Sequence, residues 1–200
     1  MSLPVEKEVR EALEPFNKRI RKVLDKGFKD FLAKRGPGNL YKRTDSADVF
    51  DSVIRAAIAE FSGKAGIRVF STGSTARFLF GGKALARFKK AIRRGRGANV
   101  PTGANDDFLN PGIPFADAPE AMKVEICWKV NDLGIGYTSV YVTARDGAGH
   151  LWSYEMPGGA QGVIEFPGKS SVPQEPRRRS VAKLKDTAKT KRKNSGGEAS

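Results

Sequence analysis

The chain has 200 residues, of which 39% are hydrophobic, a composition sufficient for one folded domain with extensions. Its formal net charge of +14 favours a polyanionic partner such as nucleic acid, an acidic protein or an acidic membrane surface. The single cysteine, Cys127, excludes an internal disulfide framework and a zinc site built from several cysteines. No apolar run is long enough for a signal peptide or a membrane span, so we expect a soluble cytoplasmic protein with no membrane partner.

Residues 4–34 predict a first helix, because apolar residues recur at spacings of three and four along one stripe. Pro4 suits the first turn, whereas Pro15 lies within the pattern and predicts a kink or break. The face opposite the stripe is rich in Lys and Arg. It is either a solvated helix surface or a surface that touches a polyanion.

A loop over residues 35–44, rich in Gly and Pro, precedes a second predicted helix over residues 46–62. Asp45 or Ser46 is the expected N-cap, and Gly63 is expected at the C-terminal end. The apolar residues of this segment again fall on one helical face, which predicts burial against a sheet or against the first helix.

Residues 67–88 fit two interpretations. The favoured one is a strand at 67–70, followed by a hairpin in which Gly81-Gly82 turns between strands at 75–80 and 83–88. A short helix or coil would then start near Lys89. The other interpretation is a helix over residues 83–93, with Leu85, Phe88 and Ile92 on one side.

The next segment, residues 95–119, has the Gly, Pro, Asn and Asp content of a long loop, with at most a turn of helix around residues 106–109. Alternating residues then predict strands at 122–130, 137–143 and 150–156, which we expect to pair antiparallel. After Gly168 the composition changes: residues 168–200 hold ten Lys or Arg against three acids, and few aliphatic residues. Such a segment predicts a disordered basic tail.

The predicted fold is therefore a single α+β domain over residues 1–167. Two N-terminal helices, 4–34 and 46–62, pack on a mainly antiparallel sheet of five or six strands drawn from residues 67–166. The tail of residues 168–200 follows.

Motifs for catalysis are weak. A P-loop would need a Gly at the position of Arg77 and a Ser or Thr at that of Ala84, so the Gly82-Lys83 step does not form one. The only histidine, His150, is expected at a hairpin exit. A metal-dependent nuclease stays an alternative because carboxylates and lysines are available for magnesium and water, although the usual strand order of Glu, one residue, then Lys is missing. These residues are Asp106, Asp107, Asp117, Glu125, Lys123 and Lys129.

Binding has the stronger signal. Seven cations and no acid fall between residues 83 and 96, and the tail carries an Arg triplet. Each phosphate neutralised by such cations adds nearly one unit to the log-log salt slope of DNA affinity. The predicted nucleic-acid-binding residues are Lys83, Arg87, Lys89, Lys90, Arg93, Arg94, Arg96, Arg177, Arg178 and Arg179. The competing interpretation is a solvated basic edge and a solubilising tail.

Three sequence stretches together resemble a group of small bacterial proteins that are encoded beside ImmA/IrrE-type helix-turn-helix metallopeptidases. The stretches are RFLFGGKALARFKKA, ANVPTG, and a β region with CWKVNDLG and VYVTARDG, and the resemblance covers residues 67–156. It implies a regulatory or toxin-antitoxin-like two-gene module with such a metallopeptidase as protein partner. Because the chain has no His-Glu-x-x-His motif, it is not itself the peptidase.

The leading functional hypothesis is a non-enzymatic regulatory or binding protein, without a cofactor, that contacts a polyanion through the basic segment and the tail. The alternatives are a metal-dependent nuclease and a protein-protein interaction module with no nucleic-acid role.

Overall fold

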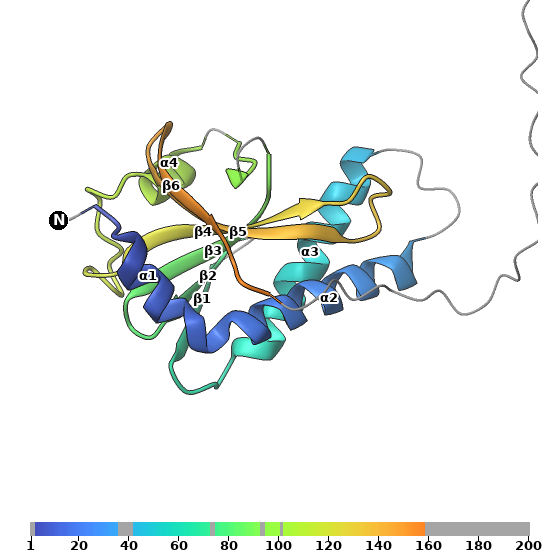
Figure 1. Ribbon diagram of the computed structural model, residues 1–200, viewed down its shortest axis with the longest axis horizontal. Helices are drawn as coiled ribbons and strands as arrows, with labels where there is room; N and C mark the ends of the chain where they lie inside the picture. Colours follow the sequence, from blue (N-terminus) through green and yellow to red (C-terminus); the bar gives the residue numbers. More distant parts are fainter. Residues whose placement is uncertain (1–2, 36–41, 73–74, 93–94, 101, 159–200) are drawn as a thin grey trace, which may run out of the picture. The chain divides into compact units, whose positions relative to one another are not determined.

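In the computed structural model, helices pack on a six-stranded mixed sheet, an α+β fold as predicted (Figure 1). The structure describes residues 3–35, 42–72, 75–92, 95–100 and 102–158, so the predicted tail lies outside the described residues. The elements in chain order are α1 (Glu6–Leu13), the 3-10 turn η1 (Glu14–Phe16), α2 (Asn17–Lys34), α3 (Lys42–Phe61), β1 (Ile67–Thr72), β2 (Thr75–Phe80), β3 (Ala84–Lys90), α4 (Gly103–Leu109), β4 (Met122–Val130), β5 (Tyr137–Asp146) and β6 (Gly149–Glu155).

The helices follow the predicted apolar stripes, with differences at their ends. The break at Pro15 is confirmed, because η1 separates α1 from α2 there. Pro4 lies before the first helix, whose N-cap is Val5. The predicted cap of the next helix is wrong: α3 begins at Lys42, and the Asp45 carboxylate pairs with Arg35 at 2.9 Å. No helix among the described residues is long and apolar enough to cross a membrane.

The sheet consists of two antiparallel meanders, β1-β2-β3 and β4-β5-β6, joined by a parallel pairing of β3 with β4. The predicted hairpin is confirmed, with φ values of 57° at Gly81 and 71° at Gly82. Strand β3 extends to Lys90, so the helical interpretation of residues 83–93 is wrong, and the chain is still in a strand at Lys89, where a short helix or coil was expected. The three C-terminal strands are antiparallel as predicted.

The parallel pairing explains the long loop that follows β3. Neighbouring parallel strands cannot be joined by a tight turn and need a connection of a dozen or more residues. The segment between Lys90 and Met122, which includes α4, is this connection, and Figure 1 shows α4 on the side of the sheet opposite α2 and α3. The loop is thus required by the topology of the sheet, whatever else it does.

Alternating strand residues divide the interior into two cores. On the face covered by α1, α2 and α3, aromatic rings pack tightly, and Phe61 lies 5.5 Å from Phe78 between ring centroids. On the other face a small apolar cluster joins Leu79 and Leu85 to Phe108 and Leu109. The same face also buries the charged side chains of Arg87 and Glu125, and it holds the site described below.

Helices α2 and α3 approach each other closely at Gly27. A Cβ atom placed there would lie 2.6 Å from Val53 Cγ2 and 2.7 Å from Val53 Cα. Because the second of these is a backbone atom, the helices would have to move apart to admit a side chain.

We therefore predict that Gly27→Ala destabilises the fold by about 1–3 kcal/mol, through overpacking of this helix contact. The free energy of unfolding in urea measures the effect. Gly103→Ala is the matched control, since nothing lies within 4 Å of a Cβ at this helical position. Equal stability of the two variants would contradict a tight contact at Gly27.

Candidate polyanion interface

The second face of the sheet holds a buried ion pair between Arg87 and Glu125. The two residues are register partners across β3 and β4. Arg87 Nη2 lies 2.8 Å from Glu125 Oε1, and the side chains are 7% and 1% exposed. Burial lowers the pKa of the Arg87 guanidinium, and the attraction of Glu125 opposes that shift. A charge buried this deeply would be strongly destabilising without an opposite charge beside it, so each of the two groups requires the other.

The connection between β3 and β4 is tied to this ion pair. Arg87 donates to the side-chain oxygens of Asn99 and Asn105, at 3.0 and 2.7 Å. Glu125 accepts from Asn99 Nδ2 at 2.9 Å and from the backbone N–H of Gly97 at 3.3 Å. The network thus fixes the loop to the sheet through polar side chains.

Two glycines allow the loop to approach the sheet. A Cβ on Gly97 would lie 2.9 Å from both oxygens of the Glu125 carboxylate. At Gly95, where φ is 72°, a Cβ would lie 2.8 Å from the Tyr141 ring. The Thr143 hydroxyl donates to the Gly95 carbonyl at 2.9 Å. The sequence Gly-Arg-Gly at 95–97 therefore holds Arg96 between two tightly docked glycines.

Further cations surround this network. Arg145 Nη1 lies 4.0 Å from Glu125 Oε2, and the Arg145 side chain is 11% exposed. Burial, followed by the nearby charge of Arg87, lowers the pKa of the Lys89 ammonium. One carboxylate therefore faces several cations, and the balance of charge on this part of the face is positive.

Two of the guanidinium groups have unused donors. The Nε atoms of Arg96 and Arg145 are buried and have no hydrogen-bond partner among the residues that the structure describes. A buried N–H of this kind is expected to find an acceptor, and an anionic oxygen is the strongest one. Each of these two N–H groups could donate to an acceptor such as a phosphate oxygen.

The predicted binding residues do not all meet on this face. Lys83 lies exposed in the turn between β2 and β3. Arg87 is buried and forms an ion pair with Glu125. Lys90 reaches Ser46 on α3, at 2.9 Å, on the helix-covered side of the sheet. Lys89 lies close enough to Arg87 and Glu125 to feel both charges, and its ammonium lies 5.7 Å from the centre of the Phe50 ring of α3. Arg96 belongs to the loop whose Gly97 N–H donates to Glu125. Arg93, Arg94, Arg177, Arg178 and Arg179 lie outside the described residues.

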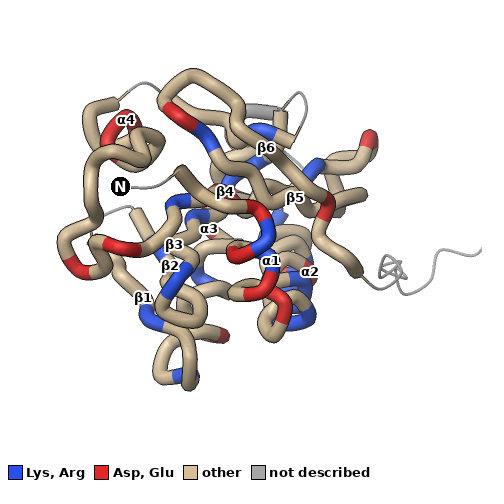
Figure 2. The backbone as a smooth tube through the Cα atoms, turned by 60° about the vertical axis from the view of Figure 1, so that its left-hand side comes forward, with Lys and Arg blue, Asp and Glu red and all other residues tan. Residues whose placement is uncertain are grey.

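The charges of the remaining surface are mixed. Figure 2 shows Lys and Arg on several elements, including α1, α2, β1 and β2, with Asp and Glu beside them on α1. On α2, Lys26 pairs with Asp30 at 2.9 Å, and Lys22 pairs with Glu60 of α3 at 2.9 Å. Two cations of the helical basic face, Lys22 and Lys26, are therefore neutralised within the protein.

The carboxylates considered for a nuclease are separated. Glu125 belongs to the buried ion pair, and Asp106 and Asp107 lie exposed on α4. Within the described part of the chain, no group of three or more His, Cys, Asp or Glu side chains could hold a metal ion together. Lys123 donates to the carbonyls of Asp107 and Asn110, at 2.6 and 3.0 Å, and so anchors the end of α4.

Sequence reasoning missed Arg145, Asn99 and Asn105. Arg145 follows the alternation of β5 beyond the predicted end of that strand at residue 143, so a longer strand would have placed it on the same face as Thr143. No periodicity reveals the two asparagines, because they come from the connecting loop and from α4.

We predict that Glu125→Gln destabilises the protein by roughly 3–5 kcal/mol, because it leaves the charge of Arg87 buried and unpaired. Urea unfolding measures the change, and Glu155→Gln, which alters an exposed carboxylate on β6, is the control. A loss no larger than that of Glu155→Gln would contradict the central role of this ion pair.

Cys127 lies one alternation beyond Glu125 on the same strand face, and it is completely buried. Burial, reinforced by the Glu125 charge, raises the pKa of the thiol well above its ordinary value. The contribution of this thiol to stability is therefore present below its ordinary pKa and is lost as the pH rises above it.

We expect Cys127 to resist a thiol reagent such as dithionitrobenzoate at about pH 8 in the folded protein, since the thiolate is the reactive form. The absorbance should rise by one thiol equivalent only when guanidinium unfolds the chain. Rapid labelling without denaturant would show that the sheet opens at this strand or that the thiol is accessible.

Comparison of the chain with protein-family models, with curated proteins and with solved structures found no match.

Proposed function

We propose that this is a non-enzymatic regulatory or binding protein that contacts a polyanion, in the first place nucleic acid. The observation that carries the proposal is the pair of buried Nε donors without a partner among the described residues, one on Arg96 in the loop after β3 and one on Arg145 of β5. A phosphate oxygen would satisfy these donors and would balance the excess positive charge around Glu125.

The overall charge supports the same proposal. The net charge of +14 is shared about equally between the body and residues 168–200, whose net charge is +7 (ten Lys or Arg minus three acids). A basic segment of this kind adds affinity for nucleic acid that does not depend on sequence and that falls as salt rises. In the proposal, Arg96 and Arg145 determine where a phosphate group binds on the protein. Arg177, Arg178 and Arg179 add nonspecific affinity for nucleic acid.

A protein partner is the second element of the proposal. It rests on the resemblance of residues 67–156 to bacterial proteins encoded beside helix-turn-helix metallopeptidases, which implies a two-gene regulatory module. If the protein acts only through such a partner, neutralising the Arg triplet at 177–179 should leave partner binding intact. The natural chain should then also show no measurable affinity for nucleic acid.

We expect the double variant Arg96→Gln/Arg145→Gln to bind mixed-sequence duplex DNA more weakly than the natural chain. Fluorescence anisotropy over a salt series measures this. The log-log salt slope should fall by about one unit for each DNA phosphate that the variant no longer neutralises.

The matched control is Lys18→Gln/Arg19→Gln, which removes two exposed cations from α2 and the same net charge. If affinity and slope fall equally in both double variants, binding depends on net charge alone, and the interface proposed around Arg96 and Arg145 is wrong. If the natural chain binds no DNA or RNA even at low salt, the polyanion proposal fails altogether.

A further inference from the structure

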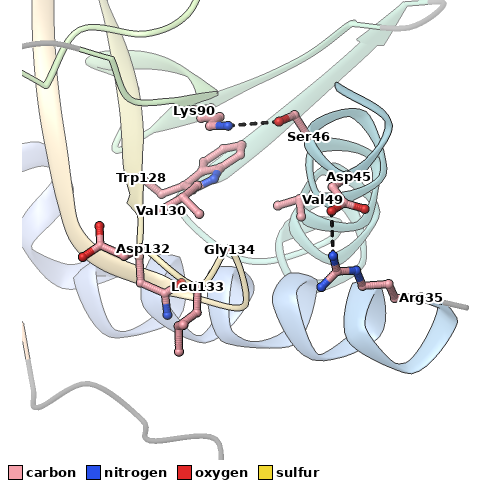
Figure 3. Close-up of a pocket in the computed structure, with 11 residues that line it drawn as sticks. Arg35, Asp45, Ser46, Val49, Lys90, Trp128, Val130, Asp132, Leu133 and Gly134 are labelled. Carbon is pink, nitrogen blue, oxygen red and sulfur yellow. Dashed lines mark hydrogen bonds and ion pairs between the residues drawn. The ribbon is translucent and has the colours of Figure 1, made fainter. Parts of the chain in front are cut away.

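A second feature lies on the helix-covered side of the sheet, separate from the proposed polyanion interface. A cavity of about 300 Å³ opens where β3 and β4 end, between the start of α3, the C-terminal end of α2 and the turn after β4 (Figure 3). Its wall includes Arg35, Asp45, Val49, Lys90, Trp128 and Val130. The volume is at the lower end of the range for small-molecule sites, so a ligand here would be small.

The indole N–H of Trp128 is the first feature that points to a ligand site. Trp128 is completely buried, and its ring stacks on Phe50 of α3 with centroids 6.4 Å apart. Its Nε1 atom has no hydrogen-bond partner within the described ranges. Buried Trp N–H groups nearly always find an acceptor, so an orphaned donor in a cavity wall indicates that an acceptor binds there.

Lys90 adds a positive charge beside that donor. Lys90 and Trp128 are register partners in the parallel pair β3–β4, so both lie at the same end of the sheet. The Lys90 ammonium donates to the Ser46 hydroxyl at 2.9 Å, which is a neutral group and leaves the charge in place. An acceptor reached by both Lys90 and Trp128 is best an anionic oxygen.

The opposite wall of the cavity offers an acceptor. Asp45 Oδ2 accepts from Arg35 Nη2 at 2.9 Å, whereas Asp45 Oδ1 is buried with no partner in the described part of the chain. Figure 3 shows Arg35 and Asp45 facing the gap from one side and Trp128 from the other, with the Asp132 carboxylate turned away from Lys90 and Arg35. The inward-facing charges are thus two cations and one acid.

From these contacts we infer that the cavity binds a small organic carboxylate with an apolar body and a hydroxyl or amino group. The carboxylate accepts hydrogen bonds from Trp128 Nε1 and from Lys90. The hydroxyl or amino group donates to Asp45 Oδ1, and the apolar body packs on Val49 and Val130. The inference does not depend on the proposed function, because it uses the other face of the sheet.

The test observes the indole N–H directly, by ¹⁵N-¹H correlation spectra of the full chain. The chain has two tryptophans, and Trp152→Phe identifies which indole signal belongs to Trp128. The Trp152 indole already donates to the Pro4 carbonyl at 2.7 Å and is the internal control. The probes are 4-hydroxybenzoate, benzoate and benzyl alcohol, which differ by the hydroxyl and the carboxylate.

We expect 4-hydroxybenzoate to shift the Trp128 indole signal downfield in a saturable manner and to leave the Trp152 signal unchanged. Benzoate should bind more weakly, and benzyl alcohol weakest of the three. Lys90→Met should weaken 4-hydroxybenzoate binding by about tenfold or more, as expected for a charged hydrogen bond. Lys129→Met, which removes an exposed lysine from β4, should leave it unchanged.

Several results would overturn the inference. One is no saturable shift of the Trp128 signal with any of the probes at millimolar concentration. A second is equal binding of benzoate and benzyl alcohol, which would show that the carboxylate is not recognised. A third is equal weakening by Lys90→Met and Lys129→Met, which would assign the effect to net charge instead of to the cavity.

Discussion

The structure depends on one buried carboxylate. Glu125 lies in the middle of β4, on the face of the sheet opposite α2 and α3, and it would be unstable there without a cation beside it. Arg87 supplies that cation from the neighbouring strand, while Asn99 and the Gly97 backbone satisfy its remaining lone pairs. The network therefore binds the two halves of the sheet and the loop between them at a single point.

The same network explains why the basic segment is not simply a surface. An exposed cation is stabilised by water, but Arg87 is almost fully buried and its charge is used for the fold. Lys89 and Arg145 lie beside Glu125, and Arg96 belongs to the loop that the network holds. Their excess over one acid makes this face electropositive without requiring a long run of exposed lysines.

Sequence periodicity predicted most elements because their local signals agree with their burial. The Gly81-Gly82 turn, the break at Pro15 and the strands after residue 121 all follow from turn chemistry or alternation. The start of α3 was missed, because Asp45, the expected cap, lies inside the helix and pairs with Arg35.

The candidate site was harder to predict than the fold. In β3 the sequence Ala-Leu-Ala-Arg-Phe is buried on both faces, so alternation alone cannot say that Arg87 is covered. That outcome depends on a loop that folds back over the strand, held by Asn99 and Asn105 at large sequence separation. The Trp128 cavity is equally hidden, because a tryptophan in an alternating strand predicts only a core residue.

The parallel pairing of β3 with β4 also has a consequence for how the protein folds. Each meander on either side of it is built from hairpins, whose contacts are close in sequence and form quickly. The pairing between them must first close a connection of about thirty residues, which gives it the largest loop-closure cost among the strand pairings of the sheet. Both the Arg87–Glu125 ion pair and the Lys90–Trp128 neighbourhood span this seam. Neither contact can form while only one meander is folded. Each contact therefore forms when the two meanders pair, and not when either meander folds by itself.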